Sequence, residues 1–357
     1  MSGAAVAAPC LVRAGNAGYG FAPQAGAWRT VEITTRIEIP AAAGRSQAWI
    51  PLPSITAQDW IRPVADEWSV STGVASAQAA GRYGTTLLHV RWDANDPQPV
   101  AVVTSRVAMR DRSIDLTKPR AHAPLGDSER ELFLSSTTLI PTDGIVKETA
   151  DRIVRGAVSD MEKARRLYDW VVVNTFRDPK TRGCGEGDIA RMLKSGNLGG
   201  KCADLNALFV GLARASGIPA RDLYGIRVAP SKFGYKSLGA NSSIITKAQH
   251  CRAEIYLAEW GWVPVDPADV RKVALEEPPG DLPLDHPQVA AARRTLFGAW
   301  ETNWIAYNWG HDIALPGSNE GPIGFLMYPQ AETAGTSRDC LDAETFKYVI
   351  TSKGVPA

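Results

Sequence analysis

The spacing of apolar residues changes from a period of two to a helical period at about residue 145. Residues 30–39 read TVEITTRIEI, in which β-branched side chains alternate with polar or charged ones. Such alternation is typical of a strand with one buried face. From Ile145 onward apolar residues recur every three or four positions, as in residues 162–176. A β-rich first part followed by a helix-containing second part predicts the α+β class.

The first part has the pattern of an all-β domain. Further strand candidates cover residues 46–51, 85–92 and 99–109, with joints rich in Pro, Gly, Asp and Asn between them. Short strands without a long amphipathic helix predict a β-sandwich-like domain over residues 27–125. We expect residues 126–144 to form a linker.

The second part, residues 145–357, is expected to form one domain with a C-terminal extension. After the helix at 162–176, a short helix is predicted around Ile189–Leu193 and a longer one from Cys202 to Ser216. Gly217 and Pro219 follow this helix, as expected at a C-terminus. Strand candidates come next, at residues 223–228, 251–257 and 261–265. Helices followed by antiparallel strands fit the same α+β class.

Composition excludes several classes of protein. The 39 Lys and Arg against 38 Asp and Glu leave a formal charge of +1, so no global field favours nucleic acid or an anionic membrane. No apolar run approaches the ~20 residues of a membrane span, so no membrane insertion is expected. Five cysteines without a C-x-x-C pair argue against a disulfide scaffold and against a zinc ribbon.

Residues 3–17, GAAVAAPCLVRAGNA, resemble the end of an export signal, with Gly15-Asn16-Ala17 as a small-x-small cleavage site. We therefore expect residues 1–26 to be disordered or a signal remnant, and the protein to be periplasmic or extracellular. A cytoplasmic protein with a loose Ala/Gly-rich start is the alternative, because no basic region precedes the apolar run. Cys10 carries no information on this point.

Cys202 is the first candidate for chemistry. It follows Gly199-Gly200-Lys201 and stands at the predicted start of a helix. Unpaired N–H groups and the helix dipole at that end stabilise a thiolate, which is a nucleophile suited to acyl transfer. A buried cysteine that only fills space is the alternative.

His250 and Asp266 are the second and third candidates. His250 stands at the start of a predicted strand, on its polar side with Arg252 and Glu254, from where it could deprotonate a thiol. Asp266 ends the strand after it, where a carboxylate could fix the tautomer of an imidazole. A surface histidine and an aspartate in a turn before Pro267 are the alternatives.

Together these segments resemble the transglutaminase-like superfamily, which shares the papain-like cysteine protease fold. The resemblance rests on GGKCADLNALFVGLARASGIPAR, QHCRAEIYL and GWVPVDPAD, and it covers about residues 145–275. It is less specific over WETNWIAYNWGHDIAL, near residues 300–315. The resemblance implies a papain-like catalytic domain in which Cys202 is the nucleophile, His250 the general base and acid, and Asp266 the orienting carboxylate.

The resemblance also implies an oxyanion hole, formed by the Cys202 backbone N–H and a second donor upstream. Trp170 and Asn197 are weak candidates for that donor. The family often has Trp two residues after its histidine, where this chain has Arg252. This departure leaves the triad intact and leaves substrate preference open.

We expect hydrolysis of peptide or amide bonds in a peptide or protein substrate through a thioester acyl-enzyme, without a cofactor. Two other functions stay open. One is a module that binds a peptide or cell-envelope polymer and keeps an idle triad. The other is a transglutaminase that transfers the acyl group to an amine, although no EF-hand-like calcium loop is present.

Several residues have a structural and a functional reading. Asp204, in the first helical turn, is expected to cap the helix. Asp269 is a second choice for the orienting carboxylate. Cys184 could form a disulfide with Cys202. A metal site that adds Cys251 and His250 to these two cysteines is disfavoured, because neighbours in a strand point to opposite faces.

Trp300, Trp304 and Tyr307 recur at helical spacing. A buried stripe on one face of a helix is the favoured reading of this spacing. A wall of the substrate cleft is the alternative.

Overall fold

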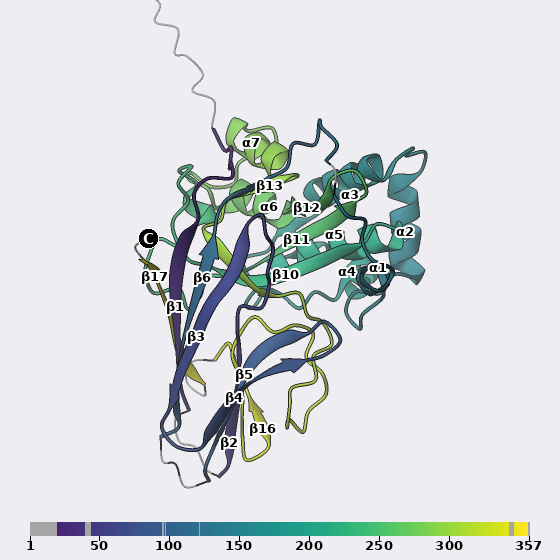
Figure 1. Cartoon of the computed structure of the whole chain (residues 1–357). Coiled ribbons are helices and arrows are strands. Elements are labelled where there is room, and N and C mark those ends of the chain that lie inside the picture. Colours follow the sequence, from purple (N-terminus) through teal and green to yellow (C-terminus); the bar gives the residue numbers. More distant parts are fainter. Residues whose placement is uncertain are drawn as a thin grey trace, which may run out of the picture.

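A computed structural model of the chain describes residues 20–39, 44–94, 96, 98–120, 122–342 and 346–355 (Figure 1). The predicted export signal, residues 3–17, and Cys10 lie outside the described residues. Within the described part, every helix is too short or too polar to cross a membrane.

Two antiparallel sheets build the β-rich part of the molecule (Figure 1). The first has the order β17-β1-β6-β3, with β1 (Arg29–Glu38), β3 (Ile61–Val70), β6 (Val100–Met109) and β17 (Lys347–Val355). The second has the order β16-β15-β2-β5-β4, with β2 (Ser46–Pro51), β4 (Val74–Ala80), β5 (Thr85–Trp92), β15 (Gln330–Thr333) and β16 (Thr336–Arg338).

An apolar core between these two sheets confirms the predicted β-sandwich-like architecture. It combines side chains of β1 and β6 with side chains of β2 and β5, among them Ile37, Val103, Ile50 and Leu88. These residues alternate with more exposed ones along β1 and β6, as a period of two requires.

The second part of the molecule is built on a sheet of order β12-β11-β10-β14. Its strands are β10 (Ala220–Arg227), β11 (Gln249–Leu257), β12 (Gly261–Val265) and β14 (Trp304–Asn308). The helices are α1 (Asp127–Leu134), α2 (Gly144–Val154), α3 (Asp160–Asn174), α4 (Ile189–Ser195), α5 (Cys202–Ala215), α6 (Pro267–Glu276) and α7 (Pro287–Thr295), with a 3-10 turn at Lys236–Leu238. Two short pairs join β7 (Arg112–Ser113) to β13 (Ala299–Trp300) and β8 (Phe176–Arg177) to β9 (Gly199–Gly200).

Helix α5 is buried over its whole length, because it packs against the sheet on one side and against α2 and α3 on the other. It contributes Leu208, Phe209 and Leu212 to the largest core, together with Ile255 of β11. A mixture of helices and antiparallel sheets confirms the α+β class. The start of α5 is thereby fixed at the edge of this core.

Two features of these segments differ from the sequence-based expectations. The segment 126–144, expected to be a linker, contains α1. Trp300, Trp304 and Tyr307 are buried as expected but lie in β13 and β14, so their helical spacing is a coincidence. The apolar residues between them in the sequence are buried too, and burial on both faces hides the period of a strand.

The C-terminal extension pairs with the strands of the sandwich instead of packing as part of the helix-containing domain. β15 pairs with β2, and β17 pairs with β1, so residues 330–355 complete the two sheets of the sandwich. The predicted boundaries, which put residues 145–357 into one domain, are therefore wrong at the C-terminal end. Pairing between strands 300 residues apart leaves no signal in local periodicity.

Candidate active site

The start of α5 is held by the carboxylate of Asp204. This carboxylate accepts the backbone N–H of Lys201 at 2.9 Å, and the N–H groups of Glu186 and Gly187 at 3.0 and 2.9 Å. Asp204 therefore caps the helix, as expected from the sequence, and also ties the loop at residues 182–187 to it. The Cys184 carbonyl accepts the Ala203 N–H at 2.9 Å, which places Cys184 beside Cys202.

Two glycines make room for this carboxylate. A Cβ on Gly200 would lie 2.5 Å from the Asp204 side chain, and one on Gly185 would lie 1.8 Å from its Oδ2. Gly185 also has φ of +96°, which disfavours any other residue. The double glycine before Cys202 thus serves close packing around the helix start.

The strands β11 and β12 bring His250 and Asp266 together. They pair antiparallel with Ala253 opposite Val265, so His250 near the start of β11 lies close to Asp266 just after β12. His250 Nε2 and Asp266 Oδ2 are 2.8 Å apart and hydrogen-bonded. The other oxygen of Asp266 accepts the Asp269 N–H at 3.0 Å and contacts Asn206 Nδ2 at 3.3 Å, so the carboxylate is fixed in orientation.

Asp269, the second choice for the carboxylate, is close as well. Its Oδ1 is 3.3 Å from His250 Nε2, but it is 2.6 Å from the guanidinium of Arg227. Asp266 makes the shorter contact with the imidazole. Asp269 therefore shares its charge between His250 and a buried arginine.

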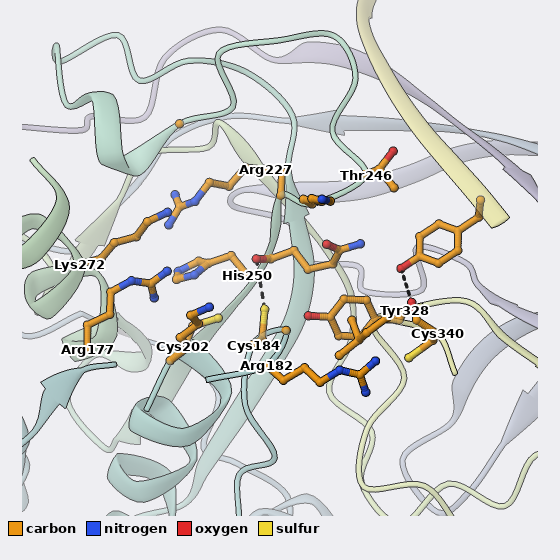
Figure 2. A pocket seen from close by; sticks show the side chains of 18 of the residues that line it. Arg177, Arg182, Cys184, Cys202, Arg227, Thr246, His250, Lys272, Tyr328 and Cys340 are labelled. Carbon is orange, nitrogen blue, oxygen red and sulfur yellow. Dashed lines mark hydrogen bonds between the residues drawn. The ribbon is translucent and has the colours of Figure 1, made fainter. Parts of the chain in front are cut away.

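Cys202 and His250 line one cavity of about 470 Å³ (Figure 2). Both are largely buried, with 3% of each residue exposed, so their route to solvent is this cavity. Cys184 lines the same cavity, and its thiol donates to the Gln249 carbonyl at 3.3 Å. Cys251 packs in the same apolar cluster as Cys202.

The surroundings favour a thiolate next to an imidazolium. Hydrogen bonds from the thiols of Cys184 and Cys251, with the charge of His250, hold the pKa of Cys202 well below its ordinary value in spite of burial. Burial and Arg227 lower the pKa of His250, but the nearby anions Asp269, Asp266 and Cys202 outweigh them and raise it to about 9. Both shifts favour transfer of the thiol proton to the imidazole.

His250, Asp266 and Asp269 also form a cluster that a metal ion could use. Arg227 lies 2.6 Å from Asp269, and Arg252 lies 3.5 Å from Asp266. Two buried guanidinium groups thus already balance the carboxylates, and His250 Nε2 is committed to Asp266. The cluster is better suited to hold a protonated imidazole than a metal cation.

Neither Trp170 nor Asn197 lies at the cavity. Trp170 packs against the main core, and the Asn197 side chain accepts the Gly199 N–H at 3.1 Å on the surface. Both were weak candidates for the second oxyanion donor, and their positions speak against that role. The cysteines at 184, 202, 251 and 340 are all free thiols.

The polar side of β11 is buried, so His250 is not the surface histidine of the alternative interpretation. Glu254 forms ion pairs with Arg112 and Arg221. The Arg252 guanidinium lies over the rings of Trp300 and Trp304. Because internal partners satisfy these charges, the strand is buried on both faces. The pattern of charges in the sequence does not distinguish paired from solvated groups.

Comparisons with known proteins bear on the family of this chain. A sequence profile for the transglutaminase-like superfamily matches residues 147–267, which include all three candidate residues. A protein of Haemophilus influenzae, described only as uncharacterized, is 35% identical over 325 residues, or 87% of this chain and 86% of the relative. The chain belongs to the transglutaminase-like superfamily. Members of this superfamily can therefore carry the sandwich described above.

One solved structure supports the same fold for this transglutaminase-like chain. A candidate cysteine protease from Cytophaga hutchinsonii superposes with a TM-score of 0.51 and 14% identity, over 92% of this chain and 99% of that one. The periplasmic domain of TgpA from Pseudomonas aeruginosa gives a TM-score of 0.35 and 16% identity, over 72% and 91% of the two chains. At such identities the first similarity concerns the fold alone.

Proposed function

We propose that this transglutaminase-like protein hydrolyses peptide or amide bonds with Cys202 as nucleophile, His250 as general base and acid, and Asp266 as the carboxylate that orients the imidazole. The observation that carries the proposal is that His250, which is hydrogen-bonded to Asp266, lines the same cavity as Cys202. A charged nucleophile at a helix start and a cationic proton donor beside it are what acyl transfer requires.

The reaction begins when the Cys202 thiolate attacks the carbonyl carbon of the substrate. The backbone N–H of Cys202 is one of the first in α5, and such groups have no partner within a helix, so it can donate to the oxyanion. His250 gives its proton to the departing amine, and a thioester to Cys202 forms. Water then attacks the thioester and His250 accepts a proton from that water. The carboxylic acid leaves, and the Cys202 thiolate and the His250 imidazolium are regenerated.

The test compares the wild-type protein with Cys202→Ala. Incubation with a mixed peptide pool, read by mass spectrometry, should show cleavage products for the wild type and none for the variant. Iodoacetamide at pH ~6 should label Cys202 in the wild type because the resting thiolate is the reactive form. Full turnover by Cys202→Ala would sink the assignment, and an inert Cys202 would favour the binding module.

We also propose that the protein acts outside the cytoplasm, on the basis of the apolar, small-residue composition of residues 3–17. Cell fractionation of the full chain tests this location. Recovery of the protein only with cytoplasmic markers would contradict it.

A further inference from the structure

The cavity at Cys202 is far more basic than the molecule as a whole. Six cationic side chains line it, and no Asp or Glu is among its lining residues in the described part of the chain: Arg177, Arg182, Lys201, Arg227, Lys247 and Lys272. The whole chain, in contrast, has a formal charge of only +1. An excess of one sign inside a concave site attracts ligands of the opposite sign.

The cations are concentrated on the His250 side of the cavity. Figure 2 shows Arg177, Arg227 and Lys272 converging on the space beside His250 and Cys202. Arg227 is balanced by Asp269, but Arg177 and Lys272 share one carboxylate, that of Glu276, with Lys272 Nζ at 3.7 Å. One positive charge of this pair therefore has no counterpart.

Lys201 and Lys272 strengthen this argument. Among the described residues, Lys201 has no ion-pair partner within 4 Å although it adjoins Cys202. The side chain of Lys272 is only 18% exposed, and burial lowers its pKa, as does the nearby Arg227. Lys272 is thus largely buried and shares its one carboxylate with Arg177, so an anionic ligand would stabilise its ammonium group.

A second, independent observation is an unpartnered donor in the same cavity. Gln249 lines it and is only 9% exposed, yet its Nε2 has no hydrogen-bond partner in the described structure. A buried amide donor without a partner destabilises the fold unless a ligand satisfies it. A carbonyl or carboxylate oxygen of a bound peptide would supply the acceptor.

From these observations we infer that the substrate is a peptide with a carboxylate close to the scissile bond, held by Lys201, Lys272 and Arg177. The inference rests on the proposed function and names its substrate class. The carboxylate comes from an acidic side chain or from a chain terminus. The aromatic side chains of Tyr328 and Tyr348 also line the cavity and offer apolar surface to the rest of the peptide.

The test compares alkylation of Cys202 by the anion iodoacetate and by neutral iodoacetamide. The ratio of the two rates cancels changes in thiol reactivity, so it measures attraction of a carboxylate into the cavity. Lys201→Gln and Lys272→Gln should each lower this ratio about threefold or more at low salt. High salt should lower the wild-type ratio. Lys194→Gln, which removes a surface charge outside the cavity, is the matched control and should leave it unchanged.

Equal ratios in the wild type, both cavity variants and the control would overturn the inference while leaving the thiolate intact. If neither reagent labels Cys202, the proposed function is wrong and the inference falls with it.

Protection of Cys202 from alkylation by iodoacetamide is a second test, which distinguishes the two sources of the carboxylate. N-acetylglutamic acid α-amide carries a side-chain carboxylate, N-acetylalanine a terminal one, and N-acetylglutamine amide none. Protection by either acid, and not by the neutral amide, supports the inference, whereas protection by neither acid contradicts it.

Discussion

The chemistry proposed for Cys202 and His250 depends on whether each side chain is protonated near neutral pH. Two buried carboxylates, Asp266 and Asp269, lie within 3.3 Å of the imidazole. Arg227 pairs with Asp269 at 2.6 Å, and Arg252 lies farther from Asp266, at 3.5 Å. Charges in a buried site are screened little by salt, so they act strongly on the imidazole. These charges favour a thiolate–imidazolium pair in the resting site, since they lower the pKa of Cys202 and raise that of His250.

The pH dependence of turnover should be bell-shaped with an alkaline limb at about 9. Above that pH His250 loses the proton it must give to the leaving amine, since its pKa is raised to about 9. At low pH turnover fails as Cys202 is protonated. Iodoacetamide labelling needs only the thiolate, so its rate should show the acid limb and stay high above pH 9. An alkaline limb near pH 7 would contradict this assignment.

The same shift affects stability. A folded-state pKa above the unfolded value of ~6.5 means that folding favours protonated His250. This contribution is fully present below pH ~6.5 and is lost as pH rises through about 9. The free energy of unfolding of the wild type, measured with urea, should therefore fall as the pH rises over this range. In His250→Gln the loss over that range should be smaller, and an equal loss would exclude His250 as its source.

Asp266→Asn should mainly lose activity, whereas Asp269→Asn should mainly lose stability. Asn at position 266 can still cap α6 but holds the imidazole in the wrong tautomer, so kcat should fall about 10³–10⁴-fold. Asn at position 269 leaves the buried Arg227 without its partner, which should cost about 3–5 kcal/mol of stability. Steady-state kinetics and denaturant unfolding of both variants separate the two roles. A larger kcat loss in Asp269→Asn would make Asp269 the orienting carboxylate.

The three proposed triad residues could be found in the sequence because each stands at the start or end of an element next to a recognisable motif. Arg227 and Gln249 could not, because an arginine inside a strand or a glutamine before a histidine is common in any sequence. Their importance comes from burial and from partners distant in the chain. Asn206, which contacts Asp266, was missed for the same reason.

At the scale of elements, the loop at residues 182–187 and the start of α5 form one unit. The Asp204 carboxylate binds both, and Cys184 is carried on the loop to the side of Cys202. The sequence predicted α5 almost to the residue, since capping and periodicity are local. It did not predict that the loop is part of the site, because that contact depends on a close approach only glycines permit.

Gly185→Ala should therefore disrupt this unit. The new Cβ would lie 1.8 Å from Asp204 Oδ2 and the residue would keep φ of +96°, so we expect a loss of about 2–4 kcal/mol and slower alkylation of Cys202. Gly156→Ala is the matched control, because its φ is +78° but nothing lies within 4 Å of a Cβ. It should lose about 1 kcal/mol and alkylate normally. Equal losses in both variants would show that backbone strain alone matters.

At the scale of the whole molecule, β17 joins the sandwich to the site. One edge of β17 pairs with β1, and on its other side Ile350 exchanges hydrogen bonds with Ile245 and Thr246, four residues before His250. Tyr348 of the same strand lines the cavity. The sandwich thus supplies part of the cavity wall, which sequence reasoning left open because β17 lies 300 residues from its partner strand.

The sandwich and the helix-containing part of the molecule, its two halves, should consequently unfold in one cooperative transition. Ile350 is 1% exposed and belongs to the core that also contains α5 and β11, although it lies on a strand of the sandwich. Ile350→Ala should cost about 2–4 kcal/mol and shift the unfolding midpoints of both halves together. Val349→Ala, one residue away and 37% exposed, should cost well under half as much. Tryptophan fluorescence reports global unfolding and pulsed alkylation of Cys184 reports the site. Because a shared core forbids independent melting, separate midpoints for these two probes would show that the halves are autonomous domains.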